Sequence, residues 1–180
     1  MKGVIFTTFN QMIEEKFGLD MWDELIDRVD PPSGGAYTAV DTYDDAELVA
    51  MVKELAGITQ TPLPDLLFAF GQYAFKPLAA SYPGAIRPDM DAKEFLQSVH
   101  DVIHVEVKKL YPDAVLPTFT YEDPAPDRLV MIYDSPRKMC PLAQGLVQGA
   151  AAHFGVRIEI NVTERDTPKG PLPSLELHFK

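Results

Sequence analysis

The sequence predicts an α+β fold: a helical N-terminal subdomain, then a C-terminal subdomain in which helices accompany a small antiparallel sheet. Helical spacing of apolar residues continues as far as Leu110. Four prolines between Pro112 and Pro126 then exclude long helices, and later segments alternate apolar and polar residues as strands do. The 180 residues suffice for one core, so we expect a single domain with subdomains of about 1–60 and 61–180.

The first three helices are expected at about residues 2–17, 20–30 and 44–57. Asp20 is the expected cap of the second helix, either Asp44 or Asp45 caps the third, and Gly57 is its expected stop. A fourth helix opens at about Pro62 and carries aromatic residues round much of its surface. It is therefore either a helix inside an ordinary core or one wall of a large apolar cavity.

A long helix is expected from Asp91 to Tyr111. Steps of three and four place five apolar residues on one buried stripe: Leu96, Val99, Ile103, Val107 and Leu110. His104 lies at the edge of that stripe, where its imidazole could point into a cavity, although a lone histidine there is more often a satisfied core residue. His100, one turn earlier, could supply half of a metal site, but the remaining ligands of a closed site are lacking.

The C-terminal part alternates between strands and one helix. PTFTYE and RLVMIYDS are predicted strands, and a helix follows from about Lys138 to Phe154. VRIEINVT and LELHF are the last two strands. Their apolar residues fall on single faces: Val156, Ile158, Ile160 and Val162 in the first, and Leu175, Leu177 and Phe179 in the second.

Composition limits the function. Sixteen basic and 27 acidic residues give a formal net charge of −11, which disfavours nucleic acid as a partner. Glu14 and Glu15 interrupt the N-terminal apolar run before a signal peptide develops, and no stretch has the roughly 20 apolar residues of a membrane span. We therefore expect a cytoplasmic protein without a membrane partner. Cys140, the only cysteine, is read as a small buried hydrophobe in preference to a reactive thiol.

The segment YDSPR places three hydrogen-bond donors at alternate positions where a strand ends. Tyr133, Ser135 and Arg137 then point the same way, and all three suit carboxylate or phosphate oxygens. The alternative is a polar strand end in which Ser135 caps the next helix and Arg137 is solvated.

Together these segments resemble the H-NOX family, the haem nitric oxide/oxygen-binding domains. The resemblance extends from MKGVIF to LELHFK and is most specific in IHVEVKKLYPDAVLPTF and YDSPRKM. It implies a bacterial stand-alone member that holds haem b between its two subdomains. His104 would be the proximal iron ligand, and Tyr133, Ser135 and Arg137 would hydrogen-bond the haem propionates. Pro117 would press on the porphyrin.

The resemblance also implies a distal wall, formed by Ile5, Phe9, Ala74, Leu78 and Leu142. Members that bind oxygen stably use a distal tyrosine supported by a tryptophan and an asparagine, and in this chain these positions correspond to Leu142, Phe9 and Ala74. Without those donors the pocket favours nitric oxide, and also carbon monoxide, over oxygen. A donor entering from Tyr73 or Tyr121 is the open alternative.

The implied function is gas sensing without catalysis. Nitric oxide would weaken the bond between His104 and iron, the haem would relax, and a separate partner would respond. In the family such partners are a histidine kinase or a cyclic-di-GMP synthase or hydrolase. The competing functions are a haem enzyme and an oxygen-binding haem carrier.

Overall fold

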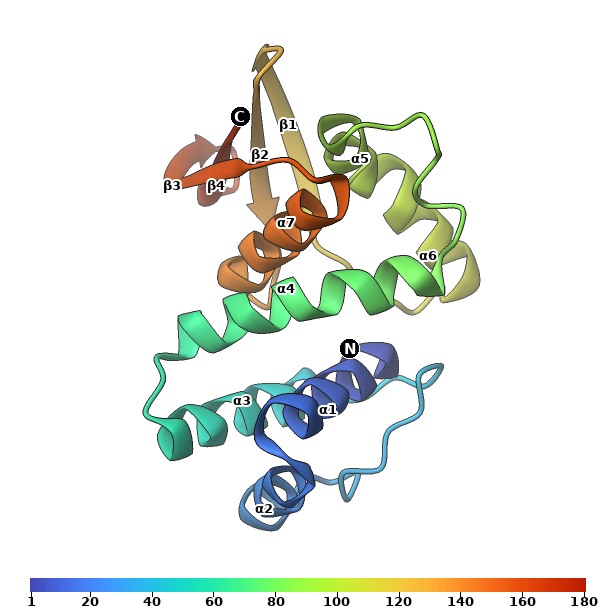
Figure 1. Ribbon diagram of the computed structural model, residues 1–180, viewed down its shortest axis with the longest axis vertical. Coiled ribbons are helices and arrows are strands. Elements are labelled where there is room, and N and C mark those ends of the chain that lie inside the picture. Colours follow the sequence, from blue (N-terminus) through green and yellow to red (C-terminus); the bar gives the residue numbers. More distant parts are fainter.

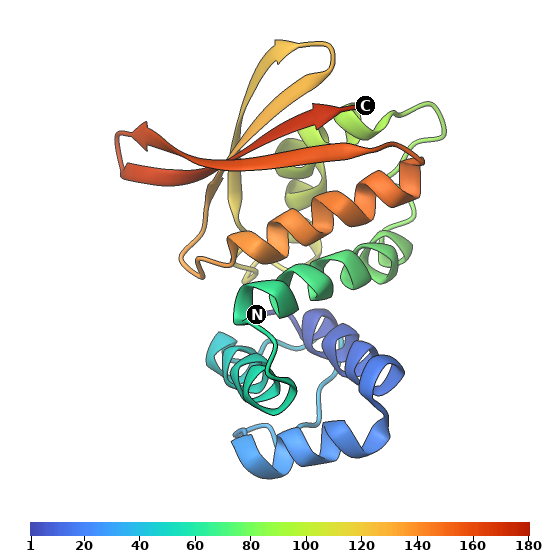
Figure 2. The same cartoon turned by 60° about the vertical axis from the view of Figure 1, so that its left-hand side comes forward.

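The computed structural model describes residues 1–180 and has three parts along its long axis (Figure 1). Helices α1 (Gly3–Phe17), α2 (Leu19–Val29) and α3 (Asp45–Thr59) form one end. Helix α4 (Leu63–Ser81) crosses the middle, and α7 (Cys140–Phe154) lies between α4 and the sheet (Figure 2). This arrangement confirms the predicted α+β fold.

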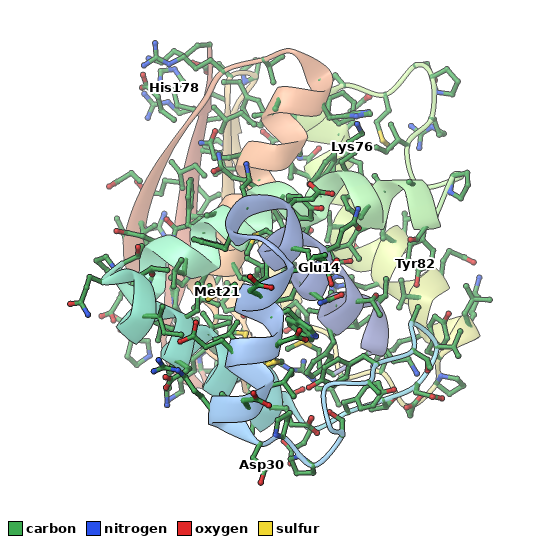
Figure 3. The ribbon with its side chains drawn as sticks, turned by 60° about the horizontal axis from the view of Figure 1, so that its bottom comes forward. Glu14, Met21, Asp30, Lys76, Tyr82 and His178 are labelled. Carbon is green, nitrogen blue, oxygen red and sulfur yellow. The ribbon has the colours of Figure 1, made fainter.

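The helical end has its own apolar core, in which Phe6, Ile13, Leu25 and Leu48 are fully buried. Figure 3 looks onto this end and shows α2 in front, with Met21 near its start and Asp30 just beyond its last residue. Helix α4 was predicted to be either a core helix or the wall of a cavity, and it is both. Phe70 is buried in this core, whereas Phe75 belongs to the other core cluster and lines a cavity.

Two predictions about helix ends were wrong. Gly18, not Asp20, precedes the first residue of α2, because α1 and α2 are joined by this single residue and leave no room for a longer connection. Helix α3 continues through Gly57 to Thr59, since Gly57 keeps helical geometry and the left-handed residue that ends the helix is Gln60, with φ 55°. Asp44 is the cap, and its carboxylate accepts the Ala46 N–H at 2.9 Å.

Helices α4 and α7 cross with their backbones in contact. A Cβ atom built on Gly71 would lie 2.2 Å from the carbonyl oxygen of Leu142, and one on Gly145 would lie 2.0 Å from that of Phe68. No side chain fits at either position, so glycine at both allows the close crossing.

The sheet contains β1 (Thr118–Ala125), β2 (Arg128–Asp134), β3 (Ile158–Thr167) and β4 (Gly170–Phe179), in the antiparallel order β1-β2-β4-β3. One face packs on α7 and buries Leu175 and Leu177 as expected, while Phe179 is half-buried. Val162 shares a strand face with buried Ile158, yet it is 44% exposed because the far end of the β3–β4 ribbon extends beyond α7 (Figure 2).

The long helix carrying His104 has three segments: α5 (Ala92–Ser98), a π-helical turn (Val99–Ile103) and α6 (His104–Leu110). Asp91 and Glu94 form a capping box at its start. The expected burial of Leu110 was wrong, since this side chain is 63% exposed. The π turn contains an extra residue, which rotates all later side chains round the helix axis relative to an uninterrupted α-helix. No helix combines the length and the apolar composition needed to cross a membrane.

Candidate functional site

A cavity of about 330 Å³ lies between the helical end, α4, α7 and the long histidine helix. Its size falls in the range of roughly 300–1,000 Å³ that is usual for small-molecule and cofactor sites. Of the 32 residues that line it, 25 are hydrophobic, so it would hold a mainly apolar group. Eight of the ten predicted site residues line it: Ile5, Leu78, His104, Pro117, Tyr133, Ser135, Arg137 and Leu142.

His104 brings a neutral imidazole to this cavity. Burial, and then the neighbouring His100, lower the pKa of His104 to about 4. The Pro117 carbonyl acts in the opposite direction, but no group meets the geometry of a hydrogen bond to the buried Nδ1. The ring is therefore uncharged at neutral pH, which is the form that binds metals.

His100 does not complete a metal site with His104. The two rings lie edge to face with their centroids 6.3 Å apart. No group of three or more histidine, cysteine, aspartate or glutamate side chains in the chain could hold a metal ion.

Strand β2 and the segment after it place the three donors of YDSPR at the cavity. Tyr133 is 5% exposed, and burial raises the pKa of its phenol, so the hydroxyl stays protonated and able to donate. The Ser135 hydroxyl accepts the Arg137 N–H at 3.3 Å and does not cap α7, whose first residue follows Met139 without a side-chain cap. The simple interpretation as a helix cap and a solvated arginine is therefore wrong.

Arg137 is held on two sides inside the protein. Its Nε donates to the Asp45 carboxylate and its Nη1 donates to the Val115 carbonyl, while its side chain is only 12% exposed. Burial raises the pKa of Asp45, but the N-terminal amino group and Arg137 together outweigh it and lower that pKa. The pair joins α3 to the turn between β2 and α7, and it leaves Nη2 of Arg137 for a further acceptor.

The two remaining predicted residues, Phe9 and Ala74, do not line the cavity. Phe9 is 1% exposed and packs edge-on against Phe70, with ring centroids 5.1 Å apart, and Ala74 is 2% exposed in the same helical core. Tyr73 and Tyr121, the alternative sources of a donor, do not line it either.

Sequence reasoning missed a polar rim formed by residues far apart in the chain. Lys2 donates to the Thr42 hydroxyl at 2.9 Å, and that hydroxyl donates to the Asp113 carboxylate at 2.7 Å. The Lys2 ammonium also lies 4.4 Å from the centroid of the Tyr111 ring. All but Tyr111 line the cavity, as does Tyr82 just after α4 (Figure 3). No local motif marks this rim, because it depends on a bridge between Lys2 and Thr42.

Cys140 is half-buried at the start of α7 and does not line the cavity. Burial raises the pKa of its thiol, and a weak contact from Gln144 at 3.8 Å opposes this only in part. The thiol is therefore protonated at neutral pH, as expected of a small buried hydrophobe.

The donor set fits haem. A haem presents a large apolar ring, a metal that accepts a neutral imidazole, and two propionate carboxylates. The cavity offers apolar walls, the unpartnered imidazole of His104, and hydroxyl and guanidinium donors at Tyr133, Ser135 and Arg137.

Comparison with known proteins agrees with this site. The family model for haem-NO-binding domains matches residues 2–162. An Fe(II) unliganded H-NOX protein from K. algicida is 36% identical, with a TM-score of 0.90 over 100% of this chain and 97% of that one. An H-NOX protein from S. oneidensis in the Fe(II)NO ligation state is 30% identical, with a TM-score of 0.91 over 100% and 99%.

A curated relative matches over a smaller share of its own length. Soluble guanylate cyclase gcy-35 from Caenorhabditis elegans is 24% identical over 173 residues. This match covers 92% of the chain but only 25% of that protein, so the chain spans about a quarter of the length of this relative.

Proposed function

Since the chain belongs to the haem-NO-binding family of H-NOX domains, which are gas-sensing haem domains, we propose that it senses nitric oxide at a ferrous haem b. In this proposal His104 is the iron ligand, oxygen is discriminated against, and a separate protein receives the signal. The observation that carries it is a single unpartnered imidazole in an apolar cavity whose rim provides donors for carboxylates.

The chain's own residues account for binding and orientation. His104 would bind the iron of a haem, and Pro117, which also lines the cavity, lies near enough for its carbonyl to influence that ring. Arg137, already fixed by Asp45 and Val115, would donate from Nη2 to a propionate, and Tyr133 and Ser135 would add hydroxyl donors. Bound haem would supply the ferrous iron at which nitric oxide binds and weakens the bond to His104.

The cavity walls explain the proposed choice of gas. Every lining residue from α1, α4 and α7 is apolar: Val4, Ile5, Phe75, Leu78, Ala79, Leu142, Ala143, Leu146 and Val147. Bound oxygen carries partial negative charge and is stabilised by a hydrogen-bond donor, whereas nitric oxide and carbon monoxide bind ferrous iron without one. These walls provide no such donor.

The polar rim offers a route from His104 to the helical end. The helix that carries His104 leads directly into Tyr111 and Asp113, which contact Lys2 and Thr42. A displacement of α6 on release of His104 would strain these contacts, and the Asp45–Arg137 pair would resist or transmit it. We expect the resulting change in shape to be read by a partner such as a histidine kinase or a cyclic-di-GMP synthase or hydrolase.

The test is visible absorption spectroscopy of the reduced, haem-loaded protein without oxygen, before and after nitric oxide, and again in air. We expect the spectrum of ferrous haem with one histidine ligand, a large change with nitric oxide, and no stable complex in air. His104→Gly should lose the histidine-ligated spectrum and regain it with added imidazole. His178→Gly is the control, because His178 pairs with Asp127 outside the cavity.

Other outcomes would identify a different function. A stable complex in air indicates an oxygen carrier, and turnover of peroxide by the reduced or oxidised protein indicates a haem enzyme. If no haem is retained after supplementation, the proposal fails. Signalling is tested by adding the protein, with and without nitric oxide, to a purified histidine kinase and to a purified cyclic-di-GMP synthase or hydrolase from the same organism and measuring their activities. Equal rates with and without nitric oxide for every one of these partners would contradict the sensing role.

A further inference from the structure

The helix that carries His104 is distorted immediately before this residue. In the π turn Val99–Ile103, the His104 N–H donates to the carbonyl of Val99, five residues back, instead of four. Single π turns are uncommon and occur frequently at functional sites. This one lies between a regular α5 and a regular α6.

The extra residue determines which way the imidazole points. At about 100° per residue, an uninterrupted α-helix would place His104 roughly 80° round the axis from Leu96, which lines the cavity. The extra residue of a π turn reduces the rotation about the helix axis by about 100°, so His104 points within about 20° of the direction of Leu96. The same rotation accounts for Leu110, which turns out to solvent.

Tyr121 of β1 holds this turn in place. Its hydroxyl accepts the backbone N–H of His100, inside the π turn, at 3.3 Å. Burial raises the pKa of Tyr121 to about 12, so the hydroxyl is neutral under all ordinary conditions. Its ring stacks on Phe119, with centroids 6.3 Å apart, and the Phe119 ring lies 6.1 Å from that of His104.

The sheet gives this contact a rigid base. Tyr121 pairs with Met131 in the register of β1 and β2, and Met131 is 1% exposed. The side chain that fixes the π turn and the strand that carries Tyr133 therefore belong to one hydrogen-bonded unit. No residue of the cavity's haem-binding set reaches the π-turn backbone in this way.

We propose that Tyr121 is a positioning residue for His104: by holding the His100 amide, it stabilises the π turn that directs the imidazole into the cavity. It touches neither haem nor gas and acts only through the helix. This role rests on the proposed binding of haem by His104. Loss of the hydroxyl would let the turn relax. The bond between His104 and iron would then become weaker or would vary in strength between molecules.

Tyr121→Phe tests this, because it removes one oxygen atom and keeps the ring that packs on Phe119. The matched control is Tyr43→Phe, which also deletes a hydroxyl that accepts a backbone N–H, that of Thr38 at 2.9 Å. The Tyr43 ring packs against Phe6 and Tyr37 in the helical end and does not line the cavity. The first measurement is the iron–histidine stretching band of the ferrous protein by resonance Raman spectroscopy. The second is hydrogen exchange of the His100 amide by NMR in the carbon monoxide complex.

For Tyr121→Phe we expect a shifted or broadened iron–histidine band and exchange at His100 that is about fivefold faster, the factor for loss of one hydrogen bond of typical net strength. Tyr43→Phe should change neither. An unchanged band and unchanged exchange in Tyr121→Phe would overturn the positioning role. If the wild-type protein has no iron–histidine band at all, the proposed function fails instead, so the two failures are distinguishable.

A deletion makes the test independent of general stability. Removing Val102, which is 51% exposed, shortens the π turn by one residue, lets the helix close as an α-helix and keeps His104 on the same face. In that background Tyr121→Phe should no longer move the iron–histidine band. A shift as large as in the full-length helix would show that Tyr121 acts by another route.

Discussion

Replacement of Gly71 by alanine should force α4 and α7 apart. The new Cβ atom would lie 2.2 Å from the Leu142 carbonyl oxygen, which is 1.2 Å short of the 3.4 Å at which ordinary contact begins. Because the obstructing atoms are backbone, no side-chain rotation relieves the clash. Overpacking of this kind typically costs about 1–3 kcal/mol. Because backbone atoms obstruct the new Cβ, the upper end of this range, about 3 kcal/mol, applies. Alanine in a helix offsets about 1 kcal/mol of this relative to glycine, so we expect a net loss near 2 kcal/mol.

Thermal unfolding of the haem-loaded protein, followed by circular dichroism, measures the effect. For a chain of this length 2 kcal/mol corresponds to a decrease in Tm of about 4–8 °C. Gly57→Ala is the matched control, since Gly57 also lies inside a helix but has no atom within 4 Å of the position that a Cβ would take, and it should raise the Tm slightly. A Gly71→Ala protein that melts at or above the wild-type temperature would refute the reasoning.

Three further predictions concern the cavity and its surroundings. Leu142→Tyr adds a donor to the apolar wall, so the reduced protein should form an oxygen complex visible by absorption in air, and a spectrum like the wild type would contradict this. The lowered pKa of Asp45 means that its ionised form contributes stability above about pH 4, which is lost as pH falls through the folded-state pKa. The wild-type advantage over Asp45→Asn in urea unfolding should therefore be present at pH 7 and decline below pH 4; a constant difference would argue against the ion pair. The raised pKa of Cys140 predicts alkylation by iodoacetamide at pH 8 that is slower than for a free thiol and faster in urea, as mass spectrometry can measure.

Local sequence patterns were sufficient for most elements and for the principal site residues. The alternate spacing of the three donors in YDSPR predicted that they share a direction, and the structure places all three at the cavity. Only Tyr133 lies in β2, however, and Ser135 and Arg137 follow in the turn after this strand. His104 reaches the same cavity on a long helix whose start and end are predicted by Asp91 and Pro112. The assigned roles of these residues toward haem remain predictions, as does the boundary between subdomains near residue 60.

Other features depend on tertiary contacts and have no local signature. A stripe with steps of three and four looks the same with or without a π turn, which is why Leu110 was misplaced. Phe9 and Ala74 were expected at the cavity, but whether an α1 or α4 residue faces the cavity or the helical core depends on how those helices are rotated against each other. The Asp45–Arg137 pair joins residues 92 positions apart, a distance that no motif spans.

The composition of the cavity wall has a consequence for biosynthesis. Its lining extends from Met1 to Leu175, so the chain must have left the ribosome through β4 before the walls are complete. Haem loading of a complete cavity therefore has to wait for β4, and chains interrupted before β4 would expose the apolar surfaces of α4 and α7 to chaperones and proteases.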